Sequence, residues 1–140
     1  MANVVQRMDV WAASIKDRPG ALAEKLAPLA DAGANLAFVI ARRTAEKAGT
    51  GVIFTTPISG RKQLAAARKA KFRKTKSLHS VKLEAPDKAG LGAKATELLA
   101  GAGINLRGLS GAAIGRRSVL YFAFDKAADA TKAARLLRKL

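Results

Sequence analysis

The sequence predicts an α+β fold that consists of two βαββαβ modules with antiparallel sheets, in which the second module lacks its last strand. The first observation is an internal repeat: nine positions between Asp17 and Leu36 are identical to the positions seventy residues later. The second is the order of the apolar patterns, which alternate on predicted strands and recur at helical spacing on predicted helices in the same order twice. A repeat of this kind fixes the number of modules. We therefore expect a first module over residues 1–77 and a second over residues 78–140.

In the first module, apolar residues alternate from Met8 to Ile15, which predicts a strand. The helix that follows has an apolar face with i, i+4 and i+7 spacing, and Gly33 is expected to end it in a left-handed conformation. Asp17 is expected to cap this helix, and Pro28 to bend or shorten it. The remaining predicted elements are strands at 36–40 and 51–56, a helix at 61–70, and a short strand or charged linker at 72–77.

The second module repeats this order, which is that of the ferredoxin-like fold. Its predicted elements are a strand at 81–85, a helix at 91–102, strands at 104–114 and 119–124, and a helix that Asp125 caps and that runs to Leu140. Because no segment remains for a last strand, one edge of this sheet needs a cover. The segment 72–77, the N-terminus and another subunit are the three candidates, and the open edge predicts tight packing between modules or a homodimer.

The composition limits the classes of function. The chain carries a net charge of +16, is 49% hydrophobic but only 5% aromatic, and contains no cysteine. No stretch is apolar enough to span a bilayer and no secretory signal is present, so we expect a cytoplasmic protein without a membrane partner. No catalytic constellation, metal-ligand cluster or nucleotide-binding loop occurs, which predicts a protein that is not an enzyme and needs no metal or cofactor.

The repeated residues resemble the ACT family of small regulatory modules that bind amino acids. The resemblance is carried by Asp17 to Ala23 with Ala32 to Leu36 in the first copy, and by Asp87 to Gly90 with Ala102 to Leu106 in the second. In the second copy Ala89 replaces the family's proline and Gly92 its usual leucine. The resemblance covers almost the whole chain and identifies it as a tandem pair of such modules.

This resemblance implies a non-catalytic regulatory protein that binds an amino acid, or a similar small carboxylate, at the strand-to-helix loops and the module interface. Free amides at a helix N-terminus suit a carboxylate, and glycine lets the backbone come close to it. The acidic side chain would face the ammonium group, and the asparagine could bind either end. The implied ligand-binding residues are Asp17, Arg18, Gly20, Ala21, Leu22, Asn35, Asp87, Gly90, Leu91 and Asn105. Ile15 stands where serine-binding members often carry histidine, which argues against serine.

Two other functions and several structural roles stay open at this stage. A basic ferredoxin-like protein could bind nucleic acid through the basic run 68–76 and the aromatic strand 117–124, although few stacking aromatics are available. A protein-interaction module without a ligand would regulate a partner protein through its surface. Asp17 and Asp87 could act only as helix caps, and Trp11 is expected to pack in the core.

Overall fold

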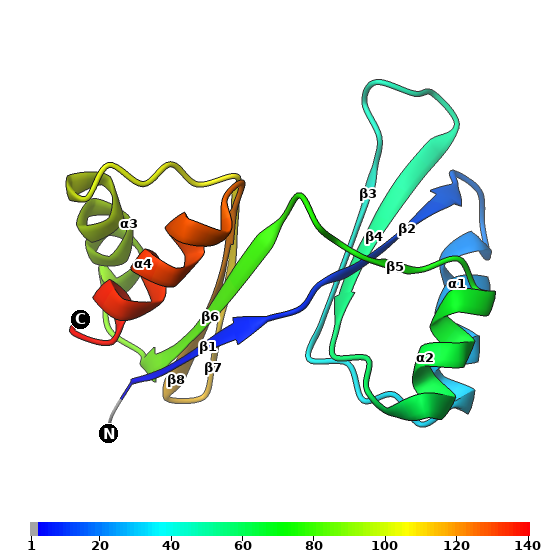
Figure 1. Ribbon diagram of the computed structural model, residues 1–140, viewed down its shortest axis with the longest axis horizontal. Helices are drawn as coiled ribbons and strands as arrows, with labels where there is room; N and C mark the ends of the chain where they lie inside the picture. Colours follow the sequence, from blue (N-terminus) through cyan, green and yellow to red (C-terminus); the bar gives the residue numbers. More distant parts are fainter. Residues whose placement is uncertain (1–2) are drawn as a thin grey trace. The chain divides into compact units, whose positions relative to one another are not determined.

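The computed structural model describes residues 3–140, which form two compact modules (Figure 1). The N-terminal module comprises Asp9–Thr75, and the C-terminal module comprises residues 76–140 together with residues 3–8. Each module has one 4-stranded antiparallel sheet, and two helices pack on one face of it. The predicted α+β fold of two ferredoxin-like modules is therefore confirmed.

The N-terminal module has the strand order β3-β4-β2-β5. Its elements are β2 (Trp11–Lys16), α1 (Ala21–Asp31), β3 (Phe38–Arg43), β4 (Thr50–Thr56), α2 (Gly60–Lys69) and β5 (Arg73–Lys74). Its core lies between the sheet and the helices and contains Trp11, Leu29, Ile53 and Phe72. Trp11 thus packs in the core, as expected.

The C-terminal module has the strand order β1-β6-β8-β7. Its elements are β1 (Val4–Met8), β6 (His79–Pro86), α3 (Leu91–Gly101), β7 (Gly108–Ile114), β8 (Arg117–Phe124) and α4 (Ala127–Leu137). Fully buried side chains of the sheet and the helices, among them Leu83, Leu99, Phe122 and Leu137, form its core.

Strand β1 covers the edge of the C-terminal sheet that the sequence left open. It pairs antiparallel with β6 over its whole length, and Val5, opposite Leu83, packs against the core of the C-terminal module. Residues 138–140, which follow α4, form no strand, and β1 takes the place beside β6. The sequence-based division at residues 77 and 78 assigns this strand to the other module, because it follows chain order and strand pairing does not.

The helix ends confirm the predicted glycine caps but not the predicted aspartate cap. Gly33 and Gly103 have φ values of 84° and 76°, and their N–H groups donate to the carbonyls of Ala30 and Ala100, which closes α1 and α3. Pro28 lies inside α1, which continues to Asp31, so it does not end the helix. The predicted cap by Asp125 is wrong, because Lys126 occupies the N-cap of α4 and no side chain caps it.

Candidate functional site

The candidate site in each module is the corner where its first helix begins. In the N-terminal module this corner, residues 16–22, joins β2 to α1, and in the C-terminal module residues 86–91 join β6 to α3. Gly20 and Gly90 are the N-cap residues, with φ values of 86° and 85°. Residues with a side chain rarely adopt this left-handed conformation, so glycine sets the shape of both corners.

Both corners are tied to the turn of the following hairpin in the same way. The N–H of Asp17 donates to the carbonyl of Gly49 at 3.0 Å, and the N–H of Asp87 donates to the carbonyl of Arg116 at 2.8 Å. Gly49 and Arg116 lie in the turns that join β3 to β4 and β7 to β8. The internal repeat of the sequence is therefore also a repeat of backbone geometry.

The two aspartates do not cap their helices, so that prediction is wrong. No side chain caps α1 or α3. The Asp17 Oδ2 atom lies 2.9 Å from Nε of Arg43, and the Asp87 Oδ1 atom accepts a hydrogen bond of 2.6 Å from the Ser118 hydroxyl. Each carboxylate therefore binds a side chain of another strand of its sheet, Arg43 of β3 or Ser118 of β8, and leaves the helix N-terminus to other partners.

The second and third amides of both helices are consequently free. In α1 the N–H of Ala21 donates to the carbonyl of Arg18 and the N–H of Glu24 to that of Gly20, and α3 has the same pair of bonds. Between them, the N–H groups of Leu22 and Ala23 have no acceptor among residues 3–140. Unpaired amides at the positive end of a helix favour an anionic group such as a carboxylate.

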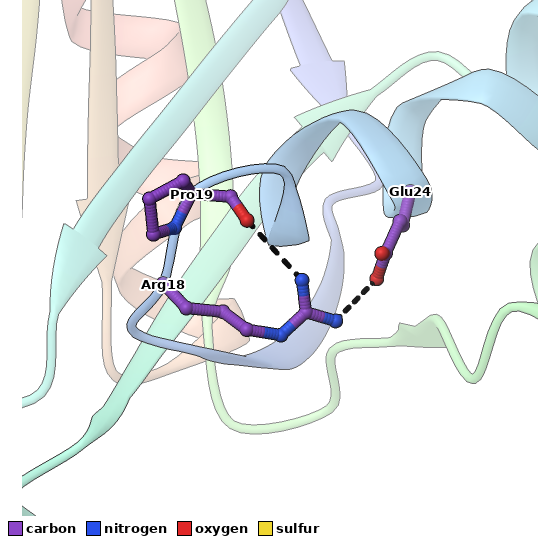
Figure 2. Close-up of polar contacts among 3 residues, drawn as sticks. All are labelled: Arg18, Pro19 and Glu24. Carbon is purple, nitrogen blue, oxygen red and sulfur yellow. Dashed lines mark hydrogen bonds and ion pairs between the residues drawn. The ribbon is translucent and has the colours of Figure 1, made fainter.

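Arg18 folds back over the N-terminal corner (Figure 2). Its Nη2 atom lies 2.7 Å from Glu24 Oε2, and Nη1 donates to the carbonyl of Pro19 at 3.2 Å (Figure 2). The hydrogen bond and the charge of Arg18 lower the pKa of Glu24, and Glu24 in turn raises the pKa of Arg18. Because Glu24 offsets part of its charge, Arg18 offers a ligand a weaker positive field than a free arginine would.

Each corner borders a cavity. At the N-terminal corner the cavity has a volume of about 920 Å³, and Lys16, Arg18 and Ala21 contribute to its wall. At the C-terminal corner it has about 340 Å³, and the wall contains residues 88–91 together with Asn3 and Leu140. A pocket for a drug-sized ligand measures about 300–1,000 Å³, so both cavities have room for an amino acid.

The predicted asparagines lie at the other end of each sheet. Lys16, next to Asp17, is paired with Thr50 at the start of β4, whereas the chain after Asn35 enters β3 beside Thr56 at its end. A strand rises about 3.4 Å per residue, which separates the two ends of β4 by about 20 Å. Asn35 therefore does not share a ligand with Asp17 of its own module, and the same topology separates Asn105 from Asp87.

The predicted leucines have a structural role. Leu22 and Leu91 are partly buried and pack against the cores of their modules, and Leu91 also lines the cavity at the C-terminal corner. The larger cavity is also lined by lysines that were not among the predicted site residues, among them Lys25, Lys62 and Lys69. Lys62 and Lys69 belong to the second helix, whose basic charge was their signal, but a solvent-exposed helix face explains that charge equally well; Lys25 lies on α1 and gave no such signal.

The aromatic strand does not form a platform for bases. Phe122 and Phe124 are fully buried in the core, where their rings stack with centroids 6.5 Å apart. Nucleic-acid readers of this fold need exposed aromatics on the open face of the sheet; Tyr121, which is partly exposed, is the one aromatic residue of this strand outside the core, so the strand offers little support for that alternative. Residues 3–140 contain no cluster of acidic residues and histidine that could hold a metal, and none of their helices is long and apolar enough to cross a membrane.

The model of the ACT domain family matches residues 13–71. This segment lies within the N-terminal module and includes its corner and both of its helices. The N-terminal module is an ACT domain. The predicted resemblance is thereby confirmed, and the C-terminal module repeats the fold of this ACT domain.

Solved structures share the two-module fold over the whole chain. Protein BT0572 from Bacteroides thetaiotaomicron has 17% identity and a TM-score of 0.75, with 99% of each chain covered. The ligand-free regulatory subunit of aspartate kinase from Thermus thermophilus has 15% identity and a TM-score of 0.66, with 99% of this chain and 96% of the other covered. A structure of aspartokinase alpha and beta subunits has 19% identity and a TM-score of 0.65, with the same coverage. At these identities the likeness concerns the fold. No curated protein matches the sequence.

Proposed function

We propose that the chain is a non-catalytic regulatory protein that binds an amino acid at the corners of its two modules. The observation that carries this proposal is the pair of free helix amides at each corner, which follow directly on a residue that lines a cavity, Ala21 in the N-terminal module and Leu91 in the C-terminal module. The amides would hold the carboxylate of the ligand, and Asp17 and Asp87 would attract its ammonium group. The ACT domain match and the fold shared with a regulatory subunit of aspartate kinase support a regulatory role.

The separation of Asp17 from Asn35 suggests how a second copy would complete the site. If β3 of one chain paired antiparallel with β3 of a second, Phe38 of that copy would lie opposite Arg43, whose side chain contacts Asp17. Asn35 of the second copy would then stand beside the corner of the first. Strand β3 is an edge strand whose Val39 is exposed at 41%, so its free backbone groups are available for such a pairing. We therefore infer a homodimer through β3.

A thermal-shift screen of the twenty amino acids tests ligand binding. A ligand at 100 times its Kd stabilises the folded state by about 2.7 kcal/mol, so one amino acid should raise the Tm by several degrees. Asp17→Asn should reduce this shift, because it removes the charge that faces the ammonium group. Glu97→Gln, on the exposed face of α3, is the matched control and should leave the shift unchanged. No shift with any amino acid would favour the interaction module without a ligand.

Sedimentation velocity tests the dimer. Val39→Lys places a charge on β3 and should convert the dimer to a monomer and weaken the amino-acid response. Leu109→Lys makes the same change on β7, the edge strand of the other module, where the side chain is exposed at 43%. A dimer that Leu109→Lys disrupts and Val39→Lys does not would contradict the pairing through β3.

A further inference from the structure

Strand β5 leaves part of the edge of β2 without a partner. It consists of only 2 residues, which pair with Trp11 and Ala12. The carbonyl of Val10 accepts a hydrogen bond from the N–H of Thr75, so the backbone groups of Val10 face the β5 edge of β2. Because the backbone groups of alternate residues face the same edge of a strand, those of Ser14 and Lys16 face the β5 edge too. The carbonyl of Lys16 accepts from the N–H of Arg18, but the N–H and C=O of Ser14 have no backbone partner among the described residues.

Open space lies directly against this free edge. One side of it is the cavity of about 920 Å³, and the other is a second cavity of about 860 Å³, both within the N-terminal module. Ser14, Lys25 and Lys71 border both cavities. We call the two cavities with the Ser14–Lys16 edge between them the β2 groove.

Basic side chains dominate the wall of the β2 groove. Its acidic residues are Glu24, which Arg18 already binds, and Asp31. The basic residues of the wall that form no ion pair within residues 3–140 are Lys16, Lys25, Lys62, Arg68, Lys69, Lys71 and Arg73; of these, Lys25 donates a hydrogen bond to the carbonyl of Ala70. So much unpaired charge of one sign around one groove attracts an anionic partner.

Lys71 holds its charge in the groove at a conformational cost. It is the only non-glycine residue between 3 and 140 with a positive φ, 65°, and its N–H donates to the carbonyl of Arg68 where α2 ends. The equivalent positions after α1 and α3 are Gly33 and Gly103, which adopt this conformation without strain.

We propose that the β2 groove binds an acidic peptide segment in extended conformation, which adds as a strand to the free edge of β2. A peptide strand presents alternating N–H and C=O groups, which is what the backbone of Ser14 and Lys16 requires. Its acidic side chains would lie among the unpaired lysines and arginines. Single-stranded nucleic acid fits less well because it needs aromatic faces for its bases, and the sole aromatic residue of the wall, Phe72, is 2% exposed.

Fluorescence anisotropy with a labelled octapeptide of alternating glutamate and threonine tests whether the basic groove binds acidic side chains. The full chain should bind this probe and not a probe with glutamine in place of glutamate. The double variant Lys69→Glu and Lys71→Glu should weaken binding by roughly tenfold or more, because both charges face the groove. Lys126→Glu with Lys139→Glu makes the same change of charge on the C-terminal module and should have little effect. Equal losses in both double variants would overturn a localised site.

Methylated probes test strand addition. One set of alternate amides of an added strand faces β2 and the other faces away. N-methylation of one set should abolish binding, and methylation of the other should leave it nearly intact. Equal binding of the two methylated probes would overturn strand addition. An oligothymidine that binds the groove more tightly than the acidic peptide, and that the Lys69 and Lys71 variants weaken, would overturn the choice of a peptide.

Discussion

Replacement of Lys71 by glycine should stabilise the protein although it removes a side chain. The residue has a φ of 65°, a conformation that costs an L-residue about 1–2 kcal/mol. Glycine adopts it freely but loses about 0.5–1 kcal/mol more conformational freedom on folding. The difference predicts that Lys71→Gly raises the free energy of unfolding by about 0.5–1 kcal/mol, which corresponds to a rise in Tm of roughly 1–4 °C.

Urea unfolding at two salt concentrations measures this change in the free energy of unfolding and separates the backbone strain from the loss of the Lys71 charge. Lys71→Ala is the matched control, because it removes the same charge but keeps a Cβ in the left-handed conformation. It should be less stable than Lys71→Gly by about 1 kcal/mol at both salt concentrations. The reverse change at the equivalent position, Gly33→Lys, should destabilise by a similar amount. Equal stability of the glycine and alanine variants would refute the assignment of strain to Lys71.

Three further substitutions test the C-terminal module. Asp87→Ala leaves the hydroxyl of Ser118, a residue only 7% exposed, without its acceptor, and should cost about 1–3 kcal/mol in urea unfolding. Leu99→Ala removes a fully buried side chain and should cost about 2.7–5 kcal/mol, a loss that a wild-type urea midpoint would contradict. The hydrogen bond from Lys82 lowers the pKa of Glu84 below its ordinary value of 4.5. The ionised Glu84 therefore stabilises the folded state above pH 4.5, and this stabilisation is lost as the pH falls through the lowered pKa. Glu84→Gln should therefore lower the Tm at neutral pH and not at about pH 2, whereas a deficit independent of pH would argue against this linkage.

Local sequence determined much of the fold. Gly33 and Gly103 mark helix ends because the left-handed cap is a property of the backbone at one position. Buried residues such as Leu29 and Leu99 could be recognised from helical spacing, because the 3.6-residue period places them on one face. The duplication and the two corners followed from identical residues at a fixed distance.

The side-chain contacts of the corners could not be predicted in this way. An aspartate just before a helix is a common cap, but here Arg43 and Ser118, which lie on other strands of the two sheets, bind the two carboxylates. Which partner a carboxylate binds depends on distances across the sheet, and a linear pattern does not contain them. For the same reason, Asn35 appeared near Asp17 in the sequence motif and lies at the far end of the sheet.

The sequence by itself determined the repeat, the α+β class and the glycine corners, because each depends on residues close together in the chain. Only the tertiary structure decided that β1 completes the C-terminal module, since strand pairing joins segments separated by most of the chain. It also decided where the charge of the basic run 68–76 lies. That charge borders a free strand edge because β5 ends after two residues and leaves Ser14 without a neighbour.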